Sequence, residues 1–423
     1  MPLRSGTWVG RWIVAYFGGL PGGALALIGT VFLMNASTFM SVPMLSVHLQ
    51  ATLGLGPLAL GTVLSLALVG PQLWPLATGP LADRFGHRRF LLGGLVLRAG
   101  AFAGLAVAAD PIWLALAALA LGLGEASYES GVYGLLARQP AVHRPRLFLL
   151  NNQALNLGVI AGPALGFLAL GLDPSGPFLA SAVAFAGLAA IMATAPWARR
   201  MASAGDAAGE DGPGGDEDAD DEAGASGGLV RRVTRTLTDP RFLALSVAML
   251  PWWFLYTQLF VSFPIRFVDL TGDEGSVGLV YLVNGVVGLA VALMALPLFR
   301  RYRETTILPV GLVIAVAALG IGLGAEAAGV FLVFVGLYTV AESLVLPSAD
   351  TAIARIARRG SESTYFGLSD LSGALGGALG HYVGSWLILT QSPRTAWWVF
   401  LAVGVAGLAG LLAARRVLDR GRG

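Results

Sequence analysis

The sequence contains twelve long apolar runs separated by short polar connections, and this pattern restricts the chain to a narrow class of folds. A helix needs about 20 apolar residues to cross a bilayer. Hydrophobic residues make up 56% of the 423 residues and charged residues only 12%, which is about half the charged fraction of a soluble domain. We therefore predict an all-α polytopic membrane protein. The expected spans are 24–49, 58–78, 90–109, 111–136, 147–170, 178–195, 242–268, 276–299, 307–323, 330–354, 365–389 and 396–412.

The connection between the second and third runs carries closely spaced charges and glycines. Such a turn cannot lie in hydrocarbon, so it marks one membrane face. An ordinary arginine-rich loop would explain the basic residues, but not the aspartate or the two spaced glycines. The stretch resembles the loop signature of the major facilitator superfamily. The matching residues are Gly79, Leu81, Asp83, Arg84, Gly86, Arg88 and Arg89.

The resemblance implies a conformational latch formed by Gly79, Asp83, Arg84, Gly86, Arg88 and Arg138. In this family the signature aspartate holds the outward-open state through contacts with the inner ends of the fourth and eleventh helices. Carried over, Asp83 would pair with Arg138 and meet the N-terminus of the helix starting near Ser363, where a carboxylate is favoured. Release of this latch would let two halves rock about a central site.

The two halves of the chain repeat each other at a nearly constant offset. An offset of 217 residues aligns Arg84 with Arg301, Glu125 with Glu342, and Arg138 with Arg355. Six spans separate the copies, so both have the same orientation, as in the parallel repeat of major facilitator transporters. The expected divisions are an N-terminal six-helix half at 1–195, a cytoplasmic linker at 196–241 and a C-terminal six-helix half at 242–423.

The expected linker contains a hydrophilic stretch, residues 202–228, with nine acidic residues and almost no large apolar side chain. This composition predicts a disordered segment. We interpret it as a flexible tether between the halves, with a regulatory role or a partner site as the alternative.

Arginine is concentrated in alternate connections, and short loops rich in arginine face the cytoplasm. We therefore expect a multi-pass protein of the cell inner membrane with both termini in the cytoplasm. The arginines of these connections are Arg84, Arg88, Arg89, Arg138, Arg144, Arg146, Arg300, Arg301, Arg303, Arg355, Arg358 and Arg359.

Three glutamates within the expected spans are candidates for proton coupling, because charges in lipid are costly and usually functional. Glu125 and Glu342 lie about 20 Å inward from Arg138 and Arg355 at 1.5 Å per helical residue. A carboxyl group there can take up and release a proton as its cavity closes and opens to water. A purely structural pairing is the alternative. Glu129 lies one turn from Glu125 on the same helical face, either as a second proton stop or as a passive, hydrated carboxylate.

Polar and aromatic residues also gather in the spans that line the central cavity in this family. Aromatic walls with carboxylates suit lipophilic cations. The adjacent Trp252 and Trp253 cannot point the same way, and exposure to lipid is the alternative for them. The expected cavity residues are Asn35, Gln72, Tyr128, Asn152, Asn156, Trp253, Tyr256, Gln258, Tyr281 and Asn284.

The fifth span contains small residues four apart and a proline, in the motif Gly158, Gly162, Pro163 and Gly166. On its own, this spacing predicts close helix packing. The motif also resembles the fifth-helix pattern of proton-coupled antiporters in the superfamily, which implies antiport. Those antiporters usually carry an arginine in the fourth span, where this sequence has Ala118. Either Arg98 in the third span replaces it, or protons pass through the two glutamates alone.

We therefore expect a secondary transporter that exports small lipophilic compounds, cations among them, in exchange for protons by alternating access. Uptake of a nutrient or metabolite is the alternative, and a non-transporting receptor or scaffold is a third reading. The sequence has no cysteine, nucleophile–base motif, phosphate loop or metal-ligand set. We therefore expect no enzyme activity, cofactor or metal. The expected partners are a small-molecule substrate, protons and the lipid bilayer, without nucleic acid, and we expect a monomer.

Overall fold

The computed structural model describes residues 19–68, 70–140, 142–171, 173–197, 231, 233–358 and 362–419. All regular secondary structure in this part of the chain is helical. Ten helical segments are long and apolar enough to cross a membrane. Two further helical stretches complete the twelve spans that the apolar runs predict. One is residues 57–85, of which residue 69 is not described, and the other is α19 (Glu362–Thr390). The predicted all-α polytopic fold is confirmed.

In the first half of the chain, prolines divide the first two spans into shorter pieces. Pro43 stands where α2 gives way to η1, and Pro75 begins α6, in keeping with the backbone donor that proline lacks. The elements are α2 (Gly22–Ser41), η1 (Val42–Met44), α3 (Leu45–Val47), η2 (His48–Thr52), α4 (Pro57–Leu68), α5 (Gly70–Leu73), α6 (Pro75–Phe85), α7 (His87–Val107), α8 (Pro111–Ala137), α9 (Arg144–Leu170) and α10 (Gly176–Thr194).

The second half repeats this pattern of broken and continuous helices. Its elements are α13 (Pro240–Tyr256), η3 (Thr257–Leu259), α14 (Ser262–Thr271), η4 (Glu274–Ser276), α15 (Val277–Met294), α16 (Leu296–Arg301), α17 (Glu304–Leu323), α18 (Ala328–Ile356), α19 (Glu362–Thr390) and α20 (Pro393–Asp419). The breaks after α13 and α15 match those after α2 and α4–α5, which agrees with the internal repeat.

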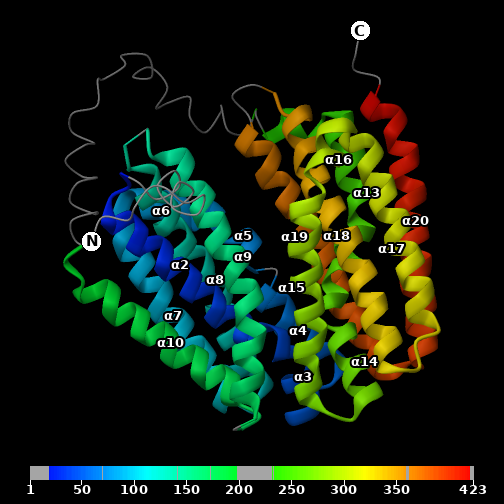
Figure 1. The fold of residues 1–423 in the computed structure, drawn as a ribbon, viewed down its shortest axis with the longest axis horizontal. Coiled ribbons are helices and arrows are strands. Elements are labelled where there is room, and N and C mark those ends of the chain that lie inside the picture. The colour runs from blue at the N-terminus through cyan, green and yellow to red at the C-terminus, as the bar shows by residue number, and fades with distance from the viewer. Residues whose placement is uncertain are drawn as a thin grey trace, which may run out of the picture.

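The helices form two bundles that lie side by side (Figure 1). Within the first bundle, α7 packs on α8 and α10, and α2 packs on α9. The equivalent helices of the second bundle make the same pairs, because α17 packs on α18 and α20, and α13 packs on α19. Contacts between the bundles are also symmetric, since α4 meets α19 and α9 meets α15. The structure therefore shows two six-helix halves related by a parallel pseudo-two-fold repeat.

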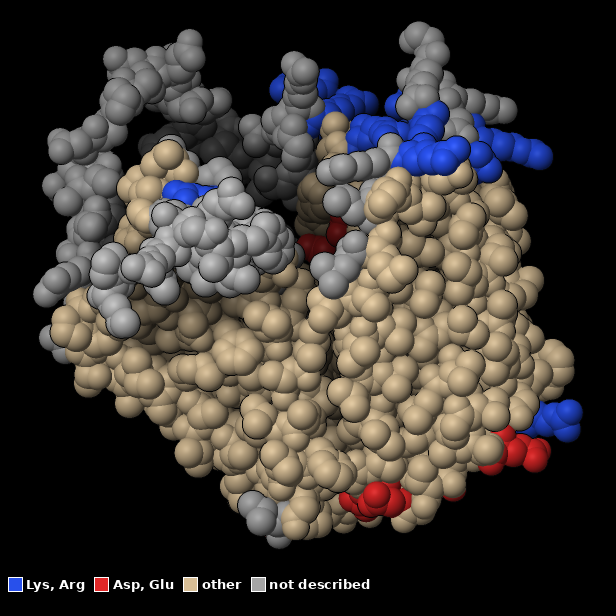
Figure 2. All heavy atoms as spheres, viewed as in Figure 1, with Lys and Arg blue, Asp and Glu red and all other residues tan. Residues whose placement is uncertain are grey.

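The two ends of the molecule differ in charge and in how closely the halves meet. Arginine side chains gather at one end, and acidic side chains gather at the other (Figure 2). At the acidic end, Oγ1 of Thr62 and the hydroxyl of Tyr382 are 3.1 Å apart across the halves, and Gly61 packs on the backbone of Tyr382. At the arginine-rich end a hollow separates the halves (Figure 2). The structure is therefore closed at the acidic end and open at the arginine-rich end.

The charged connection after the second span is more helical than we expected from the sequence. Helix α6 continues to Phe85, and α7 begins at His87, so the turn is confined to Gly86. Gly86 has φ of 96°, a conformation that glycine adopts without steric cost. The expected span ends at residue 78, and the helix continues past it through the charged residues to Phe85.

Candidate functional site

The first polar cluster lies inside the N-terminal half around Arg98 of α7. The Arg98 side chain is fully buried. One of its terminal nitrogens donates to Oε2 of Glu125 at 2.6 Å, and the other donates to Oγ1 of Thr38 at 2.6 Å. The structure therefore pairs Arg98 with Glu125. Because the buried guanidinium and the carboxylate neutralise each other, this pair offers no net charge to the cavity.

Aromatic rings complete the surroundings of Arg98. Its guanidinium carbon lies 4.9 Å from the ring centre of Phe185 and 5.4 Å from those of Phe102 and Tyr128, within the range of cation–π attraction. Tyr128 was predicted to line the cavity, but its ring is buried beside this ion pair. It therefore contributes to holding the arginine.

Two glycines allow α7 and α8 to approach closely enough to form the pair. A Cβ atom at Gly124 would lie 2.7 Å from Cγ of Arg98, and one at Gly94 would lie 2.5 Å from the backbone nitrogen of Tyr128. Neither distance is compatible with a larger residue without movement. Close backbone approach at small residues is a common way to pack membrane helices.

The second polar cluster lies in the C-terminal half around Glu342 of α18. The amide nitrogen of Asn284 donates to Oε2 of Glu342 at 3.0 Å and lies 3.0 Å from Oγ1 of Thr339. Among the residues that the structure describes, no cationic side chain forms an ion pair with Glu342. Position 315, which the repeat aligns with Arg98, is a buried alanine. The two equivalent glutamates therefore have different surroundings, one paired with a cation and one with a neutral amide.

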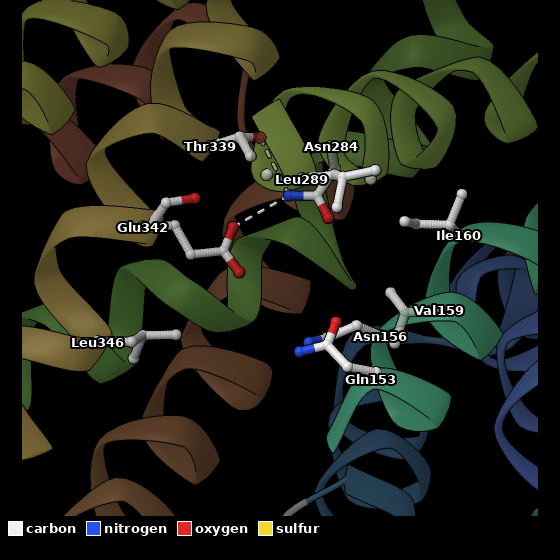
Figure 3. A pocket seen from close by; sticks show the side chains of 12 residues that line it. Gln153, Asn156, Val159, Ile160, Asn284, Leu289, Thr339, Glu342 and Leu346 are labelled. Atoms are coloured by element: carbon white, nitrogen blue, oxygen red, sulfur yellow. Dashed lines mark hydrogen bonds between the residues drawn. The ribbon is translucent and has the colours of Figure 1, made fainter. Parts of the chain in front are cut away.

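Glu342 faces a cavity of about 450 Å³ between the two halves (Figure 3). Helices α15 and α18 form one wall, and α9 forms the other. Gln153 and Asn156 of α9 lie across the cavity from Glu342 and Asn284 (Figure 3). Its lining consists of Gln153, Asn156, Val159, Ile160, Asn284, Gly285, Gly288, Leu289, Thr339, Glu342, Ser343 and Leu346.

The sequence analysis identified three residues of this lining, Asn156, Asn284 and Glu342, and missed Gln153, Thr339 and Ser343. Helical spacing could have found them. Gln153 precedes Asn156 by three residues, and Thr339 precedes Glu342 by three, so each pair shares a helix face.

Three predicted cavity residues make hydrogen bonds to backbone oxygens and do not line this cavity, and for Gln258 and Tyr281 the bond joins two elements. The amide of Asn35 donates to the backbone oxygen of Val31 at 3.2 Å. Gln258 is fully buried and donates to the backbone oxygen of Gly380 at 3.1 Å. The hydroxyl of Tyr281 donates to the backbone oxygen of Leu259 at 2.8 Å.

Three more predicted cavity residues lie at the junction of α5, α13 and α19. The rings of Trp253 and Tyr256 meet edge to face with centres 5.9 Å apart. A Cβ atom at Gly373 of α19 would lie 3.3 Å from Oε1 of Gln72 and 3.4 Å from the ring of Trp253. The side chain of Asn152 lies outside the described residues.

Glu129, the third glutamate predicted to couple protons, is half-buried one turn from Glu125. It has no ion pair within the described part of the chain.

The glycine motif of the fifth span packs α9 against α2. A Cβ atom at Gly162 would lie 2.6 Å from Cβ of Phe39, and atoms at Gly158 and Gly166 would overlap Asn35 and Met40. Pro163 lies within α9. Close packing, which the spacing alone predicts, is therefore observed at this motif. A role in antiport stays a prediction.

The predicted latch is described only in part. Gly79 lies in α6, and the Asp83 side chain lies outside the described residues, so its pairing with Arg138 stays a prediction. Arg88 donates to the backbone oxygens of Met192 and Ala193 at 3.1 and 2.9 Å, which satisfies the carboxyl end of α10. Arg84 is exposed near the ring of Phe85.

The second half contains a different ion pair at the corresponding place. Arg355 of α18 pairs with Glu304, which is buried at the start of α17. The repeat aligns Asp83 with Arg300, so the second half has no carboxylate at that position. Glu304, four residues later, supplies one instead. This pair joins two helices of the same half.

Comparison with known proteins adds independent information about the whole chain. The sequence model described as Major Facilitator Superfamily matches residues 27–337. Multidrug resistance protein MdtH of Klebsiella pneumoniae (strain 342) is 27% identical over 376 residues, which cover 86% of this chain and 87% of that protein. The protein of the same name from Yersinia pestis (strain Pestoides F) is 26% identical over 389 residues, 88% of this chain and 89% of that one.

Solved transporter structures share the fold. A POT family transporter in complex with 5-aminolevulinic acid superposes with a TM-score of 0.73 at 14% identity, covering 96% of this chain and 98% of that one. The nucleoside transporter NupG superposes with a TM-score of 0.73 at 13% identity, covering 93% and 99%. Both agree with the twelve-helix repeat, and the family match spans most of the sequence. The chain belongs to the Major Facilitator Superfamily of membrane transporters.

Proposed function

We propose that this transporter exports small lipophilic cations in exchange for protons, with Glu342 as the residue that alternately binds the proton and the cation. The observation that carries the proposal is the placement of Glu342. It faces the cavity between the halves, and its described hydrogen-bond partner is the neutral amide of Asn284. Burial of an unpaired carboxylate costs free energy, and either a proton or a substrate cation removes that cost.

The arginine-rich end is taken as the cytoplasmic end, because arginine in short connections favours that side. In this orientation both termini are cytoplasmic, and the open cavity faces the interior of the cell. A cation would bind there, and closure of the cytoplasmic end would expose it to the opposite side. A proton arriving from that side would neutralise Glu342 and release the cation. Return of the proton to the cytoplasm would restore the charged site.

The names of the sequence relatives support this direction of transport, since the two compared proteins are described as multidrug resistance proteins. Glu125 contributes differently under this proposal. Arg98 keeps its carboxylate paired, so the proposal assigns proton exchange to Glu342 and charge pairing to Glu125. Glu129, between this pair and the cytoplasmic end, is a secondary stop for protons.

Everted membrane vesicles energised by respiration test the proposal. Added tetraphenylphosphonium should cause protons to leave the acidified lumen, as followed with a pH-sensitive dye. Glu342→Gln should abolish this signal while the protein remains in the membrane at normal amounts. Asp350→Asn is a matched control, because Asp350 lies two turns farther along the same helix and is exposed. Retention of proton-coupled export in Glu342→Gln would refute the assigned role of Glu342.

Uptake of a polar metabolite is a second candidate function. The cavity wall of α9 presents two neutral carboxamides, Gln153 and Asn156, which suit the hydrogen-bonding groups of uncharged polar solutes. Right-side-out vesicles distinguish the two candidates. Accumulation of a polar solute driven by an inward proton gradient would favour uptake, and loss of a preloaded lipophilic cation under the same gradient would favour export.

A further inference from the structure

We propose that the cavity is open sideways to the lipid between α9 and α15, so that an amphiphilic monocation reaches Glu342 from the leaflet at the arginine-rich end. This inference rests on the proposed function, because it specifies both the substrate class and its path. The substrate would keep its apolar part among lipid chains and place its cationic group beside Glu342.

The first observation is where α9 and α15 touch. A Cβ atom at Gly278 would lie 3.5 Å from Phe167, and one at Gly285 would lie 3.4 Å from Ile160. Both contacts are in the part of the membrane nearer the acidic end. The cavity begins at the Ile160–Gly285 contact, which lines it. From there toward the arginine-rich end, a cavity separates the two helices instead of a packed interface.

The second observation is the absence of side chains on one strip of α15. Gly285 and Gly288 are three residues apart and both line the cavity. A Cβ atom at Gly288 would lie 3.6 Å from Thr339 and 3.9 Å from Oγ of Ser343, which are ordinary contact distances. A longer side chain would therefore lie in front of α18. Gly288 leaves Thr339 and Ser343 on the polar face of α18 uncovered on the side of α15, and Gly285 leaves space next to Ile160 of α9.

The third observation is the chemistry of the rim. The outer residues of α9 and α15 next to the cavity are large, apolar and exposed, as a lipid-facing rim requires. The side chains just inside it are polar. The exposed rim residues are Leu157 at 54%, Val286 at 53% and Leu289 at 43%. An amphiphile entering here would meet an apolar surface first and hydrogen-bonding groups second.

The view of the molecule agrees with this path. The line that joins the arginine-rich and acidic ends is vertical in Figure 2, so the molecule is seen from within the membrane plane. Acidic side chains are visible in the depth of the hollow between the halves in that view. The same front face carries α9 and α15 (Figure 1). The hollow is thus open toward the lipid as well as toward the arginine-rich end.

Fluorescence quenching in lipid nanodiscs tests the opening without any transport. The natural chain has no cysteine, so Ser343→Cys gives a single labelling position on α18 inside the cavity. An environment-sensitive fluorophore there should be quenched by phospholipids with a nitroxide near the headgroup end of the acyl chain. It should also be quenched by iodide from water. Val310→Cys, at a residue of α17 that is 48% exposed, supplies the reference for full contact with lipid.

A second substitution separates the sideways opening from the aqueous one. Gly288→Leu in the Ser343→Cys protein should reduce quenching by the nitroxide lipid to background and preserve quenching by iodide. Gly320→Leu is the matched control, because Gly320 of α17 has open space around it and should leave both signals unchanged. Background lipid quenching at Ser343→Cys, or lipid quenching that survives Gly288→Leu, would overturn the proposal.

The quenching experiment and the transport assay can each succeed or fail without the other. If the nitroxide lipid reaches Ser343→Cys but no cation is exported, the proposed function fails and the opening stands. If cations are exported but the lipid cannot reach this position, cations enter from water and the opening is refuted. Where both hold, Gly288→Leu should reduce export of dodecyltrimethylammonium more than export of the water-soluble tetraethylammonium, which does not use the sideways path. Equal loss of both cations would contradict access through lipid.

Discussion

Arg98 is the residue that makes the two halves chemically different. The repeat aligns Glu125 with Glu342, and the sequence alone gave both the same expected role. The structure pairs Glu125 with a fully buried arginine, whereas the aligned position in α17 is alanine. Removal of one partner from such a pair leaves a charge buried without compensation, and this is far more destabilising than removal of both.

Glu125→Gln should therefore lower the free energy of unfolding by about 3 kcal/mol, at the low end of values for broken buried pairs because Glu125 is partly exposed. The double variant Arg98→Gln/Glu125→Gln should recover part of this loss, since no charge remains. Thermal unfolding of the purified protein in detergent measures both changes. Glu342→Gln is the matched control and should shift the transition much less. Equal shifts for the two single glutamine variants would show that Arg98 does not depend on Glu125.

The close contact between α2 and α9 depends on glycines of α9, which have no side chain to keep the two helices apart. Gly158, Gly162 and Gly166 bring α9 close to the backbone of α2. The four-residue spacing predicted this close packing, because residues four apart share a helix face. It could not identify α2 as the partner, since that choice depends on the arrangement of all six helices in the half.

Gly166→Ala should destabilise the protein by about 1–3 kcal/mol, the range for inserting a methyl group into a packed site, because the added Cβ would overlap the backbone oxygen of Met40. Gly187→Ala in α10 is the control. Its surroundings are open, and alanine is the better helix former by about 1 kcal/mol. Thermal unfolding and the amount of protein in the membrane report both effects. An unchanged transition in Gly166→Ala would mean that α2 and α9 are not closely packed there.

The same distinction between local pattern and three-dimensional arrangement explains the other successes and errors of the sequence analysis. Long apolar runs predicted the twelve spans, and the nearly constant residue offset predicted the repeat. Polarity alone placed Asn35 and Gln258 in a cavity, although both make hydrogen bonds to backbone oxygens within the bundles. Whether a polar side chain on a membrane helix faces a cavity or a neighbouring helix depends on helix rotation, which single-sequence patterns do not determine.

The whole molecule is closed at its acidic end by contacts between α4 and α19. Gly61 packs so closely there that its Cβ atom would lie 3.0 Å from Cα of Tyr382. Under alternating access this contact must open in each transport cycle. The absence of natural cysteine allows the contact to be locked by a single introduced disulfide.

Oxidation of the double variant Gly61→Cys/Tyr382→Cys should abolish transport, and a reductant should restore it. A Cβ atom at residue 61 would lie 3.0 Å from Cα of Tyr382, so the two sulfur atoms are within reach of each other, and replacement of the tyrosine ring removes the nearest obstacle. Each single cysteine variant should be insensitive to oxidant. Full transport by the cross-linked protein would exclude opening at this end. Export in the reduced state, measured with the vesicle assay, confirms that the substitutions themselves are tolerated.

The role of the acidic segment that joins the two halves can be tested by replacing it. If residues 202–228 are a passive tether, their replacement by a neutral glycine–serine segment of equal length should preserve export and the response to protons. The vesicle assay measures this directly. Loss of function with unchanged amounts of membrane protein would favour the alternative of a regulatory or partner-binding segment.

The pairing of Arg98 with Glu125 has a consequence for the energy source of transport. Under the proposed function, one of the two equivalent carboxylates is already neutralised, so the cavity would exchange one proton for one singly charged substrate through Glu342. Such an exchange moves equal charge in both directions, so no net current crosses the membrane. A carrier of this kind draws its driving force from the difference in pH across the membrane and is insensitive to the electrical potential.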